Sequence, residues 1–107
     1  MPVTHIVMLG FSDDATPEQL QAVKDGAVGM TSDIPCIKSI KCAEDLKLAS
    51  GQSHPAGKNR SVAIIAEFES AEAYEEYAAH PAHMDYIAKC IKPILVPGSR
   101  SAIQFES

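Results

Sequence analysis

Two histidines and two tyrosines fall within the ten-residue segment Tyr77–Tyr86 of a chain that has only four histidines and three tyrosines. Pro81 lies in the middle of this segment. Because proline lacks an N–H and has a fixed φ, it suits the first turn of a helix. The segment therefore predicts a helix that ends near Ala79, a corner at His80–Pro81 and a second helix from about Ala82.

The second histidine of the segment, His83, falls on an apolar helical face. The members of that face recur at helical spacing: Tyr86, Ile87, Cys90 and Ile91. A histidine held there is a neutral base or a pocket-lining donor. Such a base could abstract a proton α to a carbonyl, and a nearby hydrogen-bond donor would stabilise the enolate. The alternative is that an inward histidine of this kind, here or at His5 on the first strand, is a satisfied core residue.

The remaining histidines offer weaker hypotheses. His80 could bind a metal together with His83, or it could end one helix and bond to the backbone at the corner. We expect the latter and no metal site, because two ligands without a further carboxylate or cysteine do not complete one. His54 lies in a Ser-His-Pro loop and is expected to be solvated, with closure over a pocket mouth as the alternative.

Other groups also have a functional and a simpler interpretation. An N-terminal Pro2 would be the base of a tautomerase, although a small second residue also simply permits removal of the initiator methionine. Arg60 could bind an acidic substrate group or be a solvated loop residue. The acidic run Glu69–Glu76 is interpreted as a solvated helix face, and Tyr74 and Tyr86 as packing residues.

Composition limits the function classes. The 107 residues suit a single domain spanning 1–107. The net charge of −5 and the lack of a Lys/Arg-rich run argue against nucleic acid and anionic membranes as partners. The sequence has no apolar run long enough for a membrane span and no leader-like start. The three cysteines form no CxxC pair, so we expect reduced thiols and a cytoplasmic protein.

The pattern of apolar residues predicts four strands and two helical regions. The strands are expected at 2–11, 36–44, 61–68 and about 100–106, and the helices at 16–34 and 70–93 with the corner described above. Thr16-Pro17-Glu18-Gln19 is a capping box, and Ser70 is a second helix cap. The order β-α-β-β-α-β predicts an antiparallel ferredoxin-like α+β sheet with both helices on one face. Because the strands are apolar on both faces, the other face needs a cover, which a second copy of the chain would supply.

Three motifs together resemble the stress-response dimeric α/β-barrel (Dabb) family: Val3-Thr-His-Ile-Val7, the segment Phe68–Tyr77, and His80-Pro-Ala-His83. The resemblance covers essentially the whole chain. It implies a homodimer in which two ferredoxin-like sheets close into a barrel. The family includes a plant polyketide cyclase, which implies a cofactor-free, aldol-type ring closure in a pocket between sheet and helices.

Carried over residue by residue, the resemblance assigns the pocket histidine of the first strand to His5 and the helix tyrosine to Tyr77. The catalytic base matches His83, and the resemblance implies that His5 is an orienting partner of this base and that Tyr77 is a hydrogen-bond donor. The chain departs from the family pattern at two pocket positions, where a histidine is replaced by Val62 and a tyrosine by Ala27. We therefore expect a wider, more apolar substrate pocket. Its predicted lining residues are Val7, Ala27, Met30, Val62 and Ile87.

The sequence thus predicts a cofactor-free cyclase, lyase or decarboxylase that acts on a small hydrophobic or polyketide-like molecule. Two alternatives stay open. One is a small-molecule-binding or stress-response protein without turnover. The other is a structural dimer whose pocket is filled by side chains.

Overall fold

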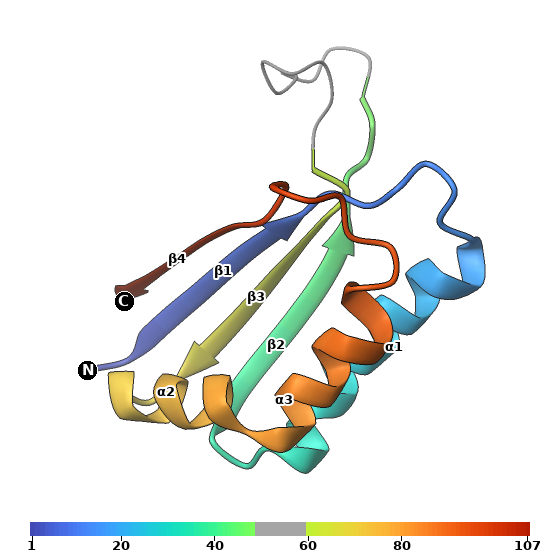
Figure 1. The fold of residues 1–107 in the computed structure, drawn as a ribbon. Helices are drawn as coiled ribbons and strands as arrows, with labels where there is room; N and C mark the ends of the chain where they lie inside the picture. Colours follow the sequence, from blue (N-terminus) through green and yellow to red (C-terminus); the bar gives the residue numbers. More distant parts are fainter. Residues whose placement is uncertain (49–59) are drawn as a thin grey trace.

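The computed structural model describes residues 1–48 and 60–107. In that part of the chain, a four-stranded antiparallel sheet lies behind a layer of helices (Figure 1). The elements in chain order are β1 (Val3–Leu9), α1 (Pro17–Asp33), β2 (Ile37–Glu44), β3 (Val62–Phe68), α2 (Ala71–Ala79), α3 (Pro81–Tyr86), the π-helix η1 (Ile87–Ile91) and β4 (Ser101–Glu106). The predicted loop 45–59, with His54, lies largely outside the described residues. None of the described helices is both long and apolar enough to cross a membrane.

The sheet has the order β2-β3-β1-β4, which confirms the predicted ferredoxin-like α+β fold. β1 and β3 are the central strands and pair antiparallel, with Val3 opposite Phe68 and Leu9 opposite Val62. Along both strands every second residue faces the helices and is buried. These positions are Val3, His5, Val7, Leu9, Val62, Ile64, Ala66 and Phe68. The alternation of side chains along β1 therefore places His5 in the core.

The two predicted helix starts are confirmed. Thr16 accepts a hydrogen bond from the backbone N–H of Gln19, and the Gln19 side chain accepts one from the Thr16 N–H, which closes the capping box. Ser70 caps α2 by accepting a hydrogen bond from the N–H of Ala73. Both caps satisfy backbone donors that the first helical turn leaves unpaired.

The region after the corner differs from the single regular helix that we predicted. α3 begins at Pro81 and passes at Ile87 into η1, where the Lys92 N–H donates to the Ile87 carbonyl at 2.9 Å. Tyr86 and Ile91 are both buried although they are five residues apart. At 3.6 residues per turn such a pair would face different sides, whereas an i→i+5 turn brings both into the core.

The alternation predicted for 36–44 is also interrupted. A register shift between Ile37 and Ser39 lets Ile37 pair with Phe68 and Ile40 with Ala66, so both isoleucines face the helices. A bulge of this kind adds one residue to one strand and reverses the parity beyond it.

The face of the sheet turned away from the helices is apolar too. By the strand register it carries Ile6 on β1, with Ile65 on β3 and Ile103 on β4 as its neighbours. Met8, Ile65, Ile103 and Phe105 remain between 38% and 58% exposed. The predicted two-sided apolar sheet is therefore present, and this second face is open in a single chain. We call it the open sheet face.

Tyr86 packs unusually close to α1. A Cβ atom at Gly26 would lie 2.7 Å from Cε1 of Tyr86, and the Tyr86 hydroxyl donates to the Val23 carbonyl at 2.7 Å. The glycine therefore leaves the space that the ring occupies. A Cβ atom at Gly29, one turn further along the same helix, would meet no other atom within 4 Å.

We expect Gly26→Ala to destabilise the protein by about 1–3 kcal/mol, because the buried ring cannot move aside without opening the core. The matched control, Gly29→Ala, should instead stabilise it by up to about 1 kcal/mol, which is the gain in helix propensity. Urea unfolding of the two variants measures both effects. Equal stabilisation by both substitutions would contradict the close packing of Tyr86 on α1.

Candidate active site

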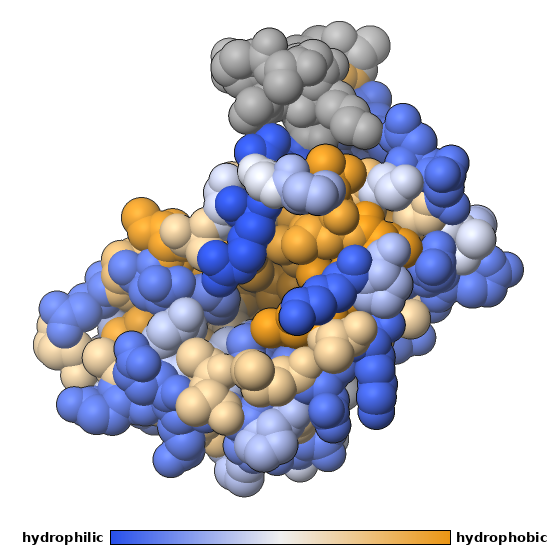
Figure 2. Space-filling model, in the orientation of Figure 1, coloured by the Kyte–Doolittle hydropathy of each residue, from blue (hydrophilic) through white to orange (hydrophobic). Residues whose placement is uncertain are grey.

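The three residues predicted to do chemistry converge on one cavity. His5 from β1, Tyr77 from α2 and His83 from α3 line a space of about 260 Å³ between the sheet and the helices. We call it the His83 cavity. Figure 2 shows an apolar hollow in this face of the molecule, flanked by hydrophilic side chains. Its apolar walls are Val7, Leu9, Ile64, Ile87, Ile91 and Leu95.

His83 is held in one orientation by the end of the preceding helix. Its Nδ1 lies 3.1 Å from the carbonyl oxygen of Ala78. Because a carbonyl can only accept, Nδ1 carries the proton and Nε2 is left as the basic nitrogen. Burial lowers the pKa of His83, and the charge of Arg100 lowers it further, although the bond to Ala78 opposes the shift. The imidazole is therefore neutral at neutral pH, as a general base must be.

His5 is buried, with 3% of its surface exposed. It is paired across the sheet with Gln104 of β4, and its Nδ1 lies 2.7 Å from the Gln104 side-chain oxygen. Burial is the main cause that lowers the pKa of His5, and the nearby charges of Arg100 and His83 act in the same direction. With Nδ1 donating to Gln104, the ring is fixed and its other nitrogen is an acceptor.

The ring of Tyr77 lies near both histidines. Its ring centroid lies 4.3 Å from that of His83 and 6.1 Å from that of His5. Burial raises the pKa of Tyr77 to about 12, so its hydroxyl stays protonated and is a hydrogen-bond donor at neutral pH. Tyr74 is a packing residue against Phe68 and His5, with ring centroids 5.7 and 5.0 Å away.

The five predicted substrate-binding residues divide into two groups. Val7 and Ile87 line the cavity. Ala27, Met30 and Val62 are buried in the core and are not among its lining residues. On the α1 side the reason is Tyr86, whose side chain fills the space against Gly26 and itself forms the cavity wall.

The two charged residues among the described lining of the cavity were not predicted from the sequence, and neither were the lining positions of Leu9, Ile64, Tyr86, Ile91 and Leu95. Lys92 and Arg100 both line the cavity although their side chains are exposed, so they stand at its rim. Neither belongs to a periodic pattern. The signals available were their positions: Lys92 lies directly before Pro93, and Arg100 lies two residues after Gly98 of the Pro97-Gly98 turn.

The other candidate residues have structural roles where they are described. His80 caps α3, since its Nδ1 accepts a hydrogen bond from the Ala82 N–H at 3.0 Å, as the corner hypothesis expected. Arg60 donates from Nε to the carbonyl of Ser99. Pro2 is exposed and does not line the His83 cavity. Across residues 1–48 and 60–107, no cluster of three or more histidine, cysteine or acidic side chains is placed to hold a metal ion.

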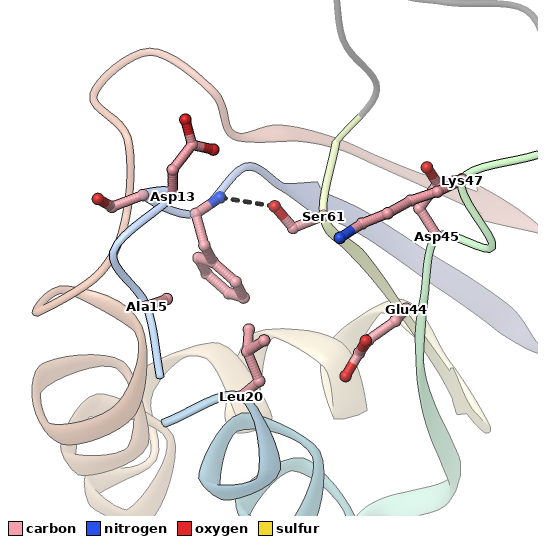
Figure 3. A pocket seen from close by; sticks show the side chains of 9 residues that line it. Asp13, Ala15, Leu20, Glu44, Asp45, Lys47 and Ser61 are labelled. Atoms are coloured by element: carbon pink, nitrogen blue, oxygen red, sulfur yellow. Dashed lines mark hydrogen bonds between the residues drawn. The ribbon is translucent and has the colours of Figure 1, made fainter. Parts of the chain in front are cut away.

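A second cavity of about 290 Å³ lies between the start of α1 and the ends of β2 and β3 (Figure 3). Asp13 lies on one side of it and Glu44, Asp45 and Lys47 on the other. The described residues that line it include no histidine, tyrosine or cysteine. Since a proton-transfer group with a pKa near neutrality is what acid–base catalysis needs, the His83 cavity is the better candidate.

Known proteins resemble this chain in both sequence and fold. The model of the stress responsive A/B barrel domain family matches residues 3–106. A stress-response A/B barrel domain-containing protein of Arabidopsis thaliana is 28% identical over 88 residues, which cover 79% of this chain and 73% of that protein. Olivetolic acid cyclase of Cannabis sativa is 28% identical over 86 residues, 80% of each chain. A dimeric ferredoxin-like protein of unknown function from Thermobifida fusca superposes with a TM-score of 0.80 at 29% identity, over 100% of this chain and 92% of that one.

The neutral state of buried His5 and half-buried His83 predicts a pH dependence of stability. Their pKa values lie below the ordinary 6.5 in the folded protein, so below that pH the unfolded chain binds more protons. The free energy of unfolding should therefore decrease as the pH falls from about 7 to about 5.

Urea unfolding across that pH range measures the slope, and His83→Gln should make it shallower. NMR titration of the imidazole protons, assigned by the resonance missing in this variant, gives the pKa of His83 directly. A value of 6.5 or above would contradict the half-buried, neutral ring.

Proposed function

Because the chain belongs to the stress responsive A/B barrel domain family, we propose that it is a cofactor-independent enzyme of the polyketide cyclase or lyase type. Its substrate would be a small hydrophobic or polyketide-like carbonyl compound. The observation that carries the proposal is the convergence of His5, Tyr77 and His83 on one apolar cavity. The similarity to olivetolic acid cyclase supports the reaction class.

The proposed reaction begins with proton abstraction. Nε2 of His83 removes a proton from the carbon α to a carbonyl, and the electron pair of the C–H bond moves onto the carbonyl oxygen as an enolate. The Tyr77 hydroxyl donates a hydrogen bond to that oxygen. In a cyclase the α carbon then attacks a second carbonyl of the same molecule. The apolar walls strengthen both interactions, because water would otherwise solvate the developing charge.

His5 has a supporting role in this proposal. Its orientation is fixed by Gln104, and its ring lies within 6.1 Å of the Tyr77 ring, centroid to centroid. Held neutral by burial, it offers one nitrogen to a substrate hydroxyl or to the enol without adding charge. It is proposed to orient the substrate.

Replacing the base provides the direct test. We expect His83→Gln to slow deuterium uptake α to the carbonyl of methyl hexyl ketone by about a hundredfold or more, because an amide cannot accept the proton at neutral pH. Proton NMR in deuterium oxide follows the exchange. Calorimetric binding of the same ketone should change little, because the glutamine amide can still donate to the Ala78 carbonyl.

The matched control is His80→Asn. This histidine lies three residues away and outside the cavity lining, and asparagine is a good helix cap, so the variant should keep wild-type exchange. If His83→Gln exchanges as fast as wild type, the base assignment is wrong. If wild-type protein does not accelerate exchange over buffer, the enzymatic proposal itself fails.

Ligand binding without turnover is the second candidate function. The walls of the His83 cavity are mostly apolar, and such a cavity suits a hydrophobic ligand even where no bond is made or broken. The exchange experiment separates the two functions, since a binding protein would take up the ketone without labelling it. The open cavity argues against the third hypothesis, a scaffold whose pocket is filled by side chains.

We further propose that the chain is a homodimer that buries the open sheet face. Exposed apolar side chains from three neighbouring strands gather there: Met8, Ile65, Ile103 and Phe105. Apolar patches of this kind mark interaction surfaces, and the Thermobifida fusca protein of the same fold is dimeric.

A cytoplasmic location is also proposed. The free cysteines Cys36, Cys42 and Cys90 fit the reducing cytoplasm.

Sedimentation velocity tests the dimer. We expect wild-type protein to sediment as a dimer at micromolar concentration and Ile103→Lys to weaken association by at least about tenfold, because the ammonium would be buried without a partner. The control is Val28→Lys, which places the same charge at an exposed position on α1. A monomeric wild type, or equal effects of both variants, would refute the proposal.

A further inference from the structure

We propose that the His83 cavity takes an elongated ligand with an apolar body and one anionic group, and that Arg100 and Lys92 bind the anionic group at the rim. The anion would be a carboxylate or a phosphate. The inference rests on the cavity being the ligand site proposed above, and it adds the charge of the ligand. It is carried by the charge, the placement and the anchoring of the two cations.

The charge around this cavity is opposite to that of the protein. The chain has 14 acidic and 9 basic residues, yet the charged residues among the described lining are both basic, Lys92 and Arg100. The second cavity is the reverse, since Asp13, Glu44 and Asp45 line it beside a single lysine. An acidic protein would repel an anion, so the local pair of cations marks a place where an anion can bind.

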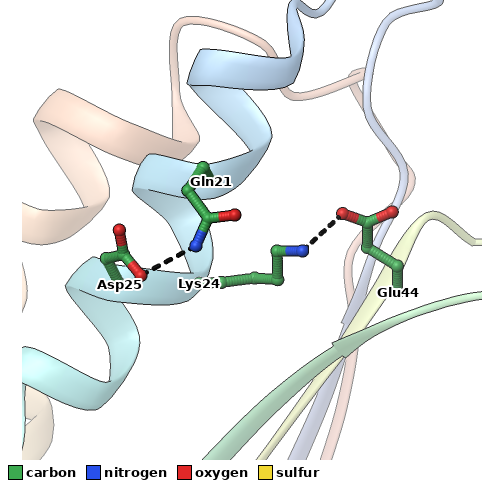
Figure 4. Close-up of polar contacts among 4 residues, drawn as sticks. All are labelled: Gln21, Lys24, Asp25 and Glu44. Atoms are coloured by element: carbon green, nitrogen blue, oxygen red, sulfur yellow. Dashed lines mark hydrogen bonds and ion pairs between the residues drawn. The ribbon is translucent and has the colours of Figure 1, made fainter.

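The two cations are available for a ligand. The ion pairs found in the described part of the chain are Lys24–Glu44, at 2.9 Å, and Lys38–Glu69, at 3.7 Å. Figure 4 shows the first of these, with Lys24 directed at the Glu44 carboxylate. Lys92 and Arg100 have no such acidic partner there. A guanidinium at a cavity rim is suited to a planar carboxylate or to phosphate oxygens.

The backbone that carries Arg100 is anchored to a distant segment of the chain. The neighbouring Ser99 is buried, and its hydroxyl oxygen accepts a hydrogen bond from the Gly10 N–H at 3.0 Å. The single hydroxyl proton has two carbonyl oxygens within reach, that of Val96 at 2.6 Å and that of Gly10 at 3.0 Å. The Ser99 carbonyl in turn accepts a hydrogen bond from Arg60. One arginine therefore positions the segment that presents the other, and Arg100 enters the cavity rim from a rigid base.

Lys92 is placed by the π-helix. The i→i+5 bond from its N–H to the Ile87 carbonyl adds a residue to the last turn and so rotates Lys92 relative to a regular helix. The turn that buries Ile91 thus also brings Lys92 to the rim.

The charge of Arg100 lowers the pKa values of His5 and His83. This effect agrees with the position of Arg100 on the same cavity as the two histidines.

The volume limits the rest of the ligand. A space of about 260 Å³ holds on the order of ten non-hydrogen atoms at the roughly 30 Å³ occupied by a water molecule. The anionic group would lie at the rim, and the three residues proposed to act in the reaction lie in the wall. The apolar part of the ligand would then lie among Val7, Ile64 and Ile87. A medium-chain acid meets this description.

The test compares a neutral and two anionic ligands that share an apolar chain of similar length. Calorimetry would measure the dissociation constants of octanoate, octanamide and octyl phosphate with the wild-type chain. We expect at least one anion to bind about tenfold or more tightly than the amide, because a charge-assisted pair replaces a neutral contact. Whichever of the two anions binds more tightly identifies the source of the charge. The preference should weaken as salt is added.

The matched variants assign the preference to residues. Arg100→Gln combined with Lys92→Gln should bring the ratio of anion to amide affinity close to one while amide binding is kept. Lys89→Gln removes the same charge from an exposed residue of η1 that does not line the cavity, and it should leave the ratio unchanged. Equal binding of acid and amide by wild type, a ratio that survives the double substitution, or no binding of any probe at millimolar concentration would overturn the inference.

The outcome does not depend on catalysis. A protein that prefers the anion but fails to label methyl hexyl ketone would refute the proposed base and leave the anion site standing. A protein that labels the ketone through His83 but shows no charge preference would refute the anion site alone.

Discussion

The corner between α2 and α3 is the constraint on which the candidate site depends. Pro81 has no N–H to donate, so α2 ends before it, and the His80 N–H closes the last turn on the Tyr77 carbonyl at 3.1 Å. His80 then caps the new helix. The change of direction leaves the Ala78 carbonyl without a helical N–H partner, and Nδ1 of His83 donates a hydrogen bond to it instead. This interruption between two helices therefore fixes the orientation and the tautomer of His83.

The corner also explains why Tyr77 and His83 are neighbours. Six residues apart on one straight helix, they would be separated along its axis by about 9 Å at 1.5 Å per residue. Because the chain turns between them, their ring centroids are 4.3 Å apart. The sheet adds His5, whose partner strand β4 provides Gln104. The site is thus assembled from a corner and a strand pair.

Burial tunes the site in one direction for all three groups. It lowers the pKa of both histidines and raises the pKa of Tyr77, so each is neutral at neutral pH. Arg100 reinforces the effect on the histidines and opposes it on the tyrosine, since a positive charge disfavours a second cation and favours an anion. The apolar interior supplies a neutral base and a neutral donor, and the positive charges stay at the solvent-exposed rim.

The sequence by itself determined the local features of this protein. The capping box at Thr16, the cap at Ser70 and the corner at Pro81 are encoded within a few residues, and strand alternation placed His5 on the buried side. The element order then determined the ferredoxin-like topology. The resemblance to a known family, rather than any spacing, connected His5 with Tyr77 and His83.

Only the tertiary structure decided what depends on contacts between distant segments. Tyr86 occupies the space beside Gly26 and keeps Ala27 and Met30 out of the cavity wall, which no pattern within α1 could indicate. The π-turn lets both Tyr86 and Ile91 be buried in the core, and Ser99 is held by Gly10, 89 residues away, beside Arg100. Local sequence encodes caps, turns and periodicity because the hydrogen bonds and backbone preferences that produce them act over a few residues. Packing joins residues that only the folded chain brings together.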